Sequence, residues 1–356
     1  MEKIRKILFV NSSLTDGGSE RVMVLLANEF SKQGYDVTMA LVREKEKETY
    51  SLNKDIKTIK FNYGTKNKLI IAIKRIMKLR KIMKKEQFHV VISFMYDINL
   101  TTLIAGQGLK IPIIISERAD PSARRQSKVY KWIEYKYYKK AHKIVFQTEE
   151  VKKMYPQDLQ KKSQVISNPV NSNLPKCYEG ERRKNIVSVG RMAEQKNFFM
   201  LIEAFAKFHN IYPDYKLFIY GEGPLLETLK EKVNELKISE MVIFPGYVKN
   251  VNEEIKDSSM YISTSNYEGI SNSMIEALAM GIPTICTDCP VGGARLMIKN
   301  KVNGILIPVG DVEVLYNSML ELAENEKLAK TISKNAIKIR ENYSIENIVE
   351  QWKKII

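Results

Sequence analysis

Short apolar runs alternate with longer amphipathic segments along the first half of the chain. The runs are rich in β-branched residues and the segments repeat apolar positions with a helical period, which predicts strands joined by helices. Such an alternation is typical of a parallel sheet with helices on both faces. The predicted strands are residues 7–10, 36–42, 90–93, 111–116 and 143–147, and the main predicted helices are residues 20–32 and 68–85.

The same alternation restarts in the second half of the chain, after a stretch rich in turn residues over 167–176 and a charged stretch over 179–184. These stretches indicate a linker. The predicted strands of the second half are 185–189, 216–220, 242–244, 260–263, 283–286 and 304–307, and helical segments follow over 312–340 and 344–356.

We therefore predict an α/β protein of two doubly wound domains, residues 1–168 and 169–340, with a C-terminal helix over 341–356 that packs back on the first domain. Parallel sheets bind ligands beyond the carboxyl ends of their strands. The predicted site accordingly lies in a cleft between the two domains.

Composition agrees with this organisation. A chain of 356 residues suits two domains better than one core. The sequence contains no run of about 18 apolar residues, so we predict no membrane-spanning helix. The N-terminal apolar run ends in a turn rather than in a signal-peptide cleavage site. The three cysteines, Cys177, Cys286 and Cys289, are an odd number and so do not indicate a framework of disulfides. Cys286 and Cys289 have CxxC spacing, but the sequence has no second cysteine pair to complete a zinc site. We expect reduced thiols, no metal and a cytoplasmic protein.

The segment 265–283 carries the clearest chemical signal. A polar loop leads into an apolar helical pattern that Ser271 or Asn272 can cap and that Gly281 can end. The start of such a helix favours an anion. Glu268 precedes the predicted helix and Glu276 lies about one turn into it. Phosphate repels carboxylates, so these two suit sugar hydroxyls.

Cationic and glycine-rich turns follow other predicted strands. Arg191 and Lys196 suit a diphosphate, because arginine bonds two oxygens at once and lysine adds a point charge. Glycine turns over 16–21, 221–224, 244–248 and 290–294 let backbone approach a ligand, although each is also compatible with an ordinary turn. Residues 221–226 begin like a dinucleotide fingerprint, but Leu226 holds its last position, which argues against a nicotinamide enzyme.

Taken in this order, the motifs resemble the retaining glycosyltransferases of family 4, over nearly the whole chain. The matching pieces are Gly17-Gly18-Ser-Glu-Arg, Val189-Gly190-Arg191, Lys196-Asn197, Gly221-Glu-Gly-Pro, Phe244-Pro-Gly246, Asn303-Gly304 and the pair Glu268 and Glu276 with its following helix. The resemblance implies the GT-B fold, in which two Rossmann-like domains face a central cleft. It also implies retention of anomeric configuration, with no cofactor and no metal.

The resemblance assigns roles to individual residues. Arg191 and Lys196 would hold the donor diphosphate and, with Glu268 on the donor sugar, form the catalytic set. Glu276 would bind the ribose hydroxyls. The remaining donor-binding residues would be Gly18 at the phosphates, Gly269, Ile270, Ser271 and Asn272 as backbone donors, and Gly246, Tyr247 and Val248 at the base, most often uracil.

The acceptor side departs from the family pattern. Many members carry a histidine after a late strand of the first domain, whereas this chain reads Glu117-Arg-Ala-Asp-Pro there. Similar runs occur in some bacterial members. Glu117 or Asp120 could orient an acceptor hydroxyl, and Arg118 could serve a phosphate.

The net charge of +16 concentrates in two segments of the first domain, residues 68–85 and 124–140. A basic amphipathic helix and a mixture of lysines with aromatic residues suit an anionic membrane surface. A core-packed helix with a solvated basic face is the alternative for 68–85. No nucleic-acid motif accompanies these segments, so we expect no nucleic acid partner.

The resemblance, together with the basic segments, implies a transferase that moves a sugar from a UDP-sugar to a lipid-linked or growing surface glycan of the capsule, exopolysaccharide or O-antigen type. The predicted location is the inner face of the cell membrane, as a peripheral protein. A non-hydrolysing nucleotide-sugar epimerase shares the two-domain architecture and is one alternative. A non-catalytic binding protein is another.

Overall fold

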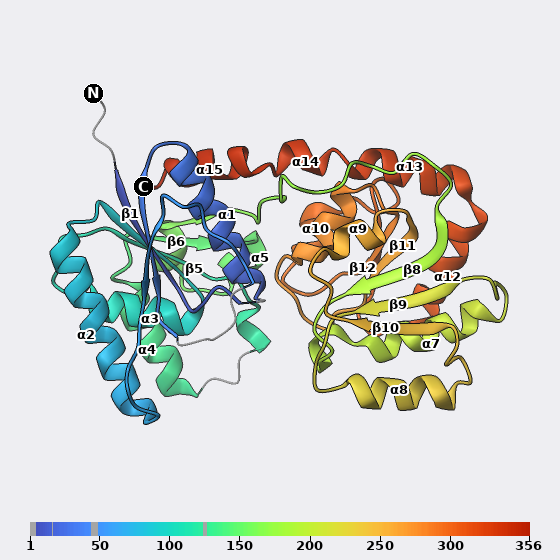
Figure 1. The fold of residues 1–356 in the computed structure, drawn as a ribbon, viewed down its shortest axis with the longest axis horizontal. Helices are drawn as coiled ribbons and strands as arrows, with labels where there is room; N and C mark the ends of the chain where they lie inside the picture. The colour runs from blue at the N-terminus through green and yellow to red at the C-terminus, as the bar shows by residue number, and fades with distance from the viewer. Residues whose placement is uncertain (1–4, 16, 44–48, 124–126) are drawn as a thin grey trace. The chain divides into compact units, whose positions relative to one another are not determined.

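The computed structural model describes residues 5–15, 17–43, 49–123 and 127–356. The chain divides into two compact units, a first unit of residues 1–169 with 345–356, and a second unit of residues 170–344. Each unit is built on one parallel sheet (Figure 1). The predicted two-domain α/β fold is confirmed.

The first unit contains a seven-stranded sheet in the order β3-β2-β1-β4-β5-β6-β7. Leu8, Phe9 and Ile114 are fully buried, as expected for central strands that are covered on both faces. The strands are β1 (Lys6–Asn11), β2 (Asp36–Leu41), β3 (Lys57–Lys60), β4 (Val90–Phe94), β5 (Ile113–Ser116), β6 (Lys143–Phe146) and β7 (Ser163–Val165).

The helices of the first unit are α1 (Gly18–Lys32), α2 (Lys68–Glu86), α3 (Tyr96–Ala105), α4 (Lys128–Tyr138), α5 (Glu149–Lys153), α6 (Gln157–Lys161) and α15 (Ile345–Lys353), with a 3₁₀ turn η1 (Pro121–Ala123). The C-terminal helix α15 packs against α1. Its Trp352 ring is fully buried and stacks on Phe94, with 5.7 Å between the ring centroids. This aromatic contact fixes the end of the chain in the core of the first unit.

The second unit contains a six-stranded sheet in the order β10-β9-β8-β11-β12-β13. Its strands are β8 (Arg183–Val189), β9 (Lys216–Tyr220), β10 (Val242–Gly246), β11 (Ser258–Ser263), β12 (Thr284–Thr287) and β13 (Ile305–Ile307). Its helices are α7 (Phe198–His209), α8 (Leu226–Glu235), α9 (Val251–Ile255), α10 (Asn272–Ala279), α11 (Gly293–Met297), α12 (Val312–Glu324), α13 (Glu326–Ala336) and α14 (Ile339–Asn342), with a 3₁₀ turn η2 (Glu194–Lys196).

Neighbouring residues of one strand enter opposite layers of the second unit. Ile186 belongs to the apolar cluster under α7, α8 and α12, whereas Val187 belongs to the cluster under α9 and α10. Figure 1 shows α7 and α8 on one side of this sheet and α9 and α10 on the other. The continuous apolar runs in the sequence therefore reflect strands that are buried on both faces.

Several elements differ from the sequence prediction. The strand that we predicted from residue 111 begins at Ile113. The short edge strands β3 and β7 were not predicted, because edge strands are short and polar. The helical segment over 312–340 is three helices, and the side chain of Asn325 caps the second by accepting a hydrogen bond from the backbone of Leu328.

Candidate active site

Helix α10 begins as the sequence predicts. The Ser271 hydroxyl is its N-cap and accepts a hydrogen bond from the Met274 amide at 3.5 Å, while Gly281 takes a left-handed φ of +67° just beyond the helix. Ser273 in the first turn donates to the Val189 carbonyl at 3.2 Å, which ties the start of α10 to the end of β8. The positive end of the helix therefore lies at the carboxyl edge of the sheet, where parallel sheets bind ligands.

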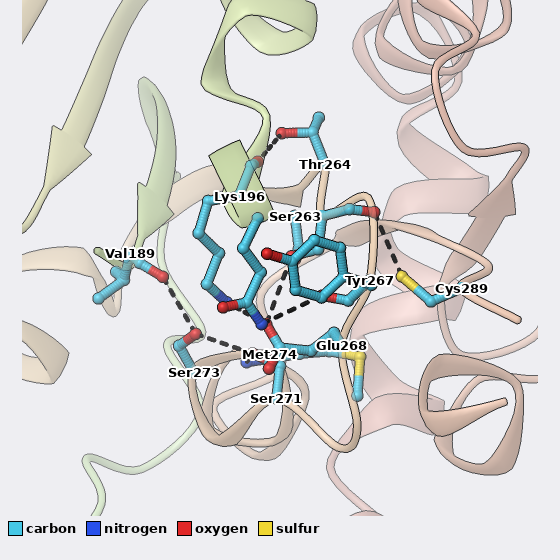
Figure 2. Close-up of polar contacts among 12 residues, drawn as sticks. Val189, Lys196, Ser263, Thr264, Tyr267, Glu268, Ser271, Ser273, Met274 and Cys289 are labelled. Carbon is cyan, nitrogen blue, oxygen red and sulfur yellow. Dashed lines mark hydrogen bonds and ion pairs between the residues drawn. The ribbon is translucent and has the colours of Figure 1, made fainter. Parts of the chain in front are cut away.

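Two of the three predicted catalytic side chains form an ion pair. Lys196 Nζ lies 2.5 Å from Glu268 Oε2, and only 15% and 22% of the two side chains are exposed (Figure 2). An ideal Cβ on Gly190 would lie 2.9 Å from Lys196 Cε, so the lysine stem runs against the glycine that precedes Arg191. In the part of the chain that the structure describes, the exposed Arg191 side chain makes no hydrogen bond or ion pair.

Hydrogen bonds connect the two loops that carry Lys196 and Glu268. Asn266 donates its amide to the Gln195 carbonyl at 2.8 Å. Thr264 Oγ1 donates to the Lys196 carbonyl at 2.9 Å, and Asn197 Nδ2 donates to Asn266 Oδ1 at 2.9 Å. These supporting residues were missed from the sequence, because their partners lie about 70 positions away and leave no local pattern.

The loop before α10 is also supported by the segment after β12. Thr287 Oγ1 and Cys289 Sγ both donate to the Ser265 carbonyl, at 2.7 and 3.2 Å. An ideal Cβ on Gly293 would lie 1.7 Å from the Gly269 carbonyl oxygen, so only glycine fits beneath that loop. Thr287, Cys289 and Gly293 thus support the loop that carries Glu268.

The thiols of the CxxC pair are suited to packing rather than to chemistry. Burial raises the pKa of Cys286 to about 12 and that of Cys289 to about 11. Both thiols are therefore neutral near pH 7, and a neutral thiol is a poor nucleophile and a poor metal ligand.

The two glycines that follow β9, Gly221 and Gly223, lie close to backbone atoms of the turn that carries Arg191. An ideal Cβ on Gly221 would lie 2.1 Å from the Gly190 carbonyl oxygen, and one on Gly223 would lie 2.3 Å from the Met192 carbonyl oxygen. Met192 also donates its amide to the Glu222 carbonyl at 2.9 Å. These glycines make room for the turn that carries Arg191, so their close approach is to the chain itself.

The predicted nucleotide-binding residues lie on helix α10 with the loop before it, and at the end of strand β10. Glu276 is 5% exposed and accepts a hydrogen bond from Asn252 Nδ2 at 3.3 Å. Gly246 ends β10 with a φ of +75°, and the Tyr247 side chain beyond it is 50% exposed. Val248 is half-buried and Ile270 is buried. The arrangement offers a carboxylate for hydroxyls and an exposed aromatic ring for a flat base.

The start of α1 in the first unit already holds a carboxylate. Glu20 accepts hydrogen bonds from Ser12 Oγ at 2.5 Å and from Ser19 Oγ at 2.7 Å, and an ideal Cβ on Gly17 would meet its Oε2 at 1.9 Å. Glu20 thus lies over the helix start at Gly18, while Asp16 of the same motif lies outside the described residues. A phosphate at Gly18, which stays a prediction, would have to displace it.

Both acidic residues after β5 are engaged within the first unit. Glu117 Oε1 accepts from Asn99 Nδ2 at 3.2 Å and from the Tyr138 hydroxyl. Asp120 Oδ1 accepts from the Ser122 amide and hydroxyl at 2.8 and 2.6 Å. These bonds give the two carboxylates a structural role, and their predicted contact with an acceptor hydroxyl stays a prediction.

Comparison with known proteins matches two families in tandem. Residues 16–174 match Glycosyltransferase Family 4 and residues 174–339 match Glycosyl transferases group 1. An uncharacterized glycosyltransferase of Haemophilus influenzae is 29% identical over 355 residues, which cover 98% of each chain.

A named relative and a solved structure extend the comparison. The GalNAc-alpha-(1->4)-GalNAc-alpha-(1->3)-diNAcBac-PP-undecaprenol alpha-1,4-N-acetyl-D-galactosaminyltransferase of Campylobacter jejuni is 29% identical over 361 residues, covering 99% of this chain and 98% of its own. The crystal structure of Anabaena HepE in complex with UDP and glucose has the same fold, with a TM-score of 0.83, 17% identity and 98% of both chains covered.

Proposed function

The chain belongs to the GT-B glycosyltransferases that join a family 4 domain to a group 1 domain, and from this membership we propose its donor, its acceptor and its stereochemistry. The donor is a UDP-sugar, the acceptor is a lipid-linked or growing surface glycan, and the transferred sugar keeps its anomeric configuration. HepE was crystallised with UDP, and the Campylobacter enzyme is named for a diphospho-undecaprenol acceptor. Those names support the proposal for this chain.

The observation that carries the proposal is the ion pair between Lys196 and Glu268 next to the start of α10. A diphosphate that approaches this site competes with Glu268 for the lysine ammonium. Lys196 and Arg191 then neutralise the leaving diphosphate, and the released Glu268 carboxylate accepts a hydrogen bond from a hydroxyl of the sugar. This is electrostatic stabilisation by groups that are already in position.

We propose the following bond changes. The bond between the anomeric carbon and the phosphate oxygen breaks, and a bond to the acceptor oxygen forms on the same face of the sugar. The acceptor proton passes to the departing diphosphate. Lys196 and Arg191 carry the compensating positive charge, and we propose that the step needs no metal and no cofactor.

We propose that Glu276 and Tyr247 select the nucleotide. A buried carboxylate accepts hydrogen bonds from two vicinal hydroxyls, which suits a ribose. An exposed tyrosine at the end of β10 offers a face for stacking against uracil. Gly246, Val248 and the backbone of 269–272 complete this proposed set.

The acceptor side of the proposal rests on the surface of the first unit. The first half of α2 exposes Leu69, Ile73 and Met77, and α2 buries only Leu79 and Met83 among its residues. The fully buried positions of α2 therefore lie in its C-terminal half. On α4, Val129, Tyr130 and Trp132 are more than half exposed. Residues 124–126 of the predicted basic segment lie outside the described residues.

We propose that these exposed apolar residues, with the surrounding lysines, rest on an anionic membrane at its inner face. The net charge of +16 favours such a surface. Within the described residues, no helix has the length and apolar character to cross a bilayer.

The test is transfer from UDP-sugars to a polyprenyl-diphosphate-linked glycan. We expect a glycosylated lipid and free UDP in equal amounts, with UDP release dependent on the acceptor, and we expect Glu268→Gln to lower the rate of both by about 10²–10³-fold. An epimerised donor without acceptor dependence would favour the epimerase alternative, and lipid binding without any UDP release would favour the binding-protein alternative.

A further inference from the structure

Arg118 follows β5 at the carboxyl edge of the first unit's sheet, and it is held on three sides. Its side chain is 8% exposed. Nη1 donates to Asn168 Oδ1 at 2.8 Å, and the guanidinium carbon lies 4.4 Å from the centroid of Phe94 and 5.8 Å from that of Trp352. Both aromatic contacts are within the range of cation–π attraction. The guanidinium therefore has one fixed orientation.

The remaining edge of this guanidinium has no partner. Among the described residues, Nε and Nη2 of Arg118 make no hydrogen bond, and no carboxylate forms an ion pair with the side chain. These two nitrogens are the side-on fork with which arginine binds two oxygens of one phosphate or carboxylate. Burial lowers the pKa of Arg118 to about 9, so the fork still carries its charge at neutral pH.

Two further buried polar atoms near Arg118 lack a partner. One is Ser167 Oγ, next to the Asn168 that holds Nη1, and the other is Nε1 of Trp352. The nearby carboxylates of Glu117 and Asp120 are directed to other donors. The region thus contains unpaired donors and a positive charge. An unpaired buried donor costs free energy, which an anion would recover.

We propose that Arg118 binds a phosphate group of a substrate, through its Nε and Nη2 fork. The proposal rests on the proposed function, because a transferase with a nucleotide-sugar donor and a lipid-linked acceptor meets two diphosphates. A water molecule would satisfy individual donors but would leave the charge uncompensated. A purely structural role, in which Arg118 only holds α15 in place through its contact with Trp352, does not explain why Nε and Nη2 have no partner.

The two fork nitrogens are enclosed, so an anion reaches them only when the packing around Arg118 opens locally. Trp352 lies directly against the guanidinium, and its indole must respond to that opening. This coupling supplies a local reporter. The chain has two tryptophans, and the exposed Trp132 can be replaced by phenylalanine so that Trp352 alone fluoresces.

The test titrates the full-length Trp132→Phe protein with inorganic pyrophosphate, UDP and farnesyl diphosphate, while Trp352 emission is recorded. We expect a saturable change with pyrophosphate. Saturation with UDP at lower concentration than with farnesyl diphosphate assigns the site to the donor, and the reverse order assigns it to the lipid-linked acceptor. Arg118→Lys keeps the charge without the fork and should weaken binding by about tenfold or more, and Arg118→Gln should abolish the response.

The proposal is overturned if Trp352 emission shows no saturable response to any of the three anions, or if the response is unchanged in Arg118→Lys. The lysine variant decides the matter if the glutamine variant does not fold. Thermal stabilisation by UDP that depends on Glu276 is measured in the same samples. If UDP still stabilises the protein while Trp352 emission does not change, the proposed Arg118 site is wrong and the proposed donor site is retained.

Discussion

Lys196 Nζ and Glu268 Oε2 lie 2.5 Å apart, although 72 positions separate the two residues in the chain. One comes from the turn after β8 and the other from the loop before α10. Both side chains are mostly buried, so solvent screens their attraction only weakly. The pair holds a cation and an anion ready at one place, and a ligand that carries both a diphosphate and hydroxyls can exchange partners with each of them.

Replacing either member of this pair should have opposite effects on nucleotide binding. In Glu268→Gln the lysine loses its competitor, so UDP binding should stay equal or tighten, while turnover falls by about 10²–10³-fold. In Lys196→Gln, UDP binding should weaken. Calorimetry with UDP and turnover with an acceptor measure the two effects.

The exposed pair Glu227 and Lys230 on α8 supplies the matched control, because it is an ion pair of ordinary surface type. Glu227→Gln should change neither UDP binding nor turnover. A double-mutant cycle between Lys196 and Glu268 should give a coupling energy of about 0.5–3 kcal/mol. Weaker UDP binding in Glu268→Gln, equal to that in Lys196→Gln, would contradict the exchange of partners.

Glu276→Gln tests the ribose contact. The substitution keeps the volume and removes the negative charge, so we expect UDP affinity to fall by about tenfold, the range for a hydrogen bond to a charged group. The sharper measurement compares UDP with 2′,3′-dideoxy-UDP. The native protein should discriminate between them and Glu276→Gln should not. Equal discrimination in both proteins would place the ribose elsewhere.

The sequence predicts the parts of this site that depend on local rules. The strand ends, a helix cap at Ser271 or Asn272, a helix end at Gly281 and the placement of Glu268 and Glu276 around the helix start all follow from short patterns. The supports of the Glu268 loop do not. Thr287 and Cys289 reach the Ser265 carbonyl across 22 and 24 positions, and nothing in their own segment reports that contact.

The burial of individual charged and apolar side chains is the second feature that local sequence patterns do not predict. Periodicity marks the apolar stripe of α2, but only tertiary packing decides that Leu79 is buried while Leu69 is 71% exposed. In the same way, the sequence suggests a phosphate ligand for Arg118, but among 57 lysines and arginines it does not indicate that this guanidinium is buried. Its enclosure between Phe94 and Trp352 depends on a helix at the far end of the chain.

Gly293→Ala should impair catalysis through the loop above it. The added methyl would meet the Gly269 carbonyl at 1.7 Å, so the loop that carries Glu268 must move. We expect a loss of turnover of at least tenfold, with about 1–3 kcal/mol lost from the free energy of unfolding, as for overpacking of a core. Turnover and chemical denaturation provide the measurements.

Gly180→Ala is the matched control for that substitution. The atoms nearest to its methyl would belong to the flexible Tyr178 side chain, with the hydroxyl oxygen at 2.6 Å. Stability and turnover should therefore stay near those of the native protein. If Gly293→Ala retained full turnover, the loop position would not matter for the transfer.

The buried thiols predict an alkaline loss of stability. Burial raises the pKa of Cys286 and Cys289 from 9.0 to about 12 and about 11. Between pH 9 and these values the unfolded thiols lose protons and the folded thiols keep them, so the free energy of unfolding falls as pH rises. Below pH 9 the contribution is fully present. Cys286→Ala with Cys289→Ala should flatten the profile above pH 9, as followed by urea denaturation.

The same thiols should be protected from reagents in the native state. At pH 8 we expect a thiol reagent to modify Cys177, which is half-buried, and to reach the other two only after unfolding. Cys177→Ser then removes the native reaction and leaves two thiols in denaturant. Rapid native modification of Cys289 would show that the loop support opens readily.

The exposed face of α2 gives the test of membrane contact. Leu69, Ile73 and Met77 are 71%, 51% and 65% exposed, and residues four apart on a helix lie on one side of it. Lys74 and Lys78 turn toward the backbone carbonyls of Tyr63 and Asn62, which leaves this side apolar. Transfer of such side chains into the headgroup boundary is favourable, and the lysines at 68, 81, 84 and 85 add attraction to anionic lipid.

Serine at positions 69, 73 and 77 should therefore lower binding to vesicles of anionic phospholipid by about tenfold or more, in a sedimentation assay. Serine at Ile211, Leu296 and Val302, three exposed apolar residues of the second unit, is the matched control and should leave binding unchanged. High salt should weaken binding of the native protein only in part, because the apolar contribution is not screened. Complete loss of binding in high salt, with no effect of the serine substitutions at α2, would reduce the contact to electrostatics alone and remove α2 as its anchor.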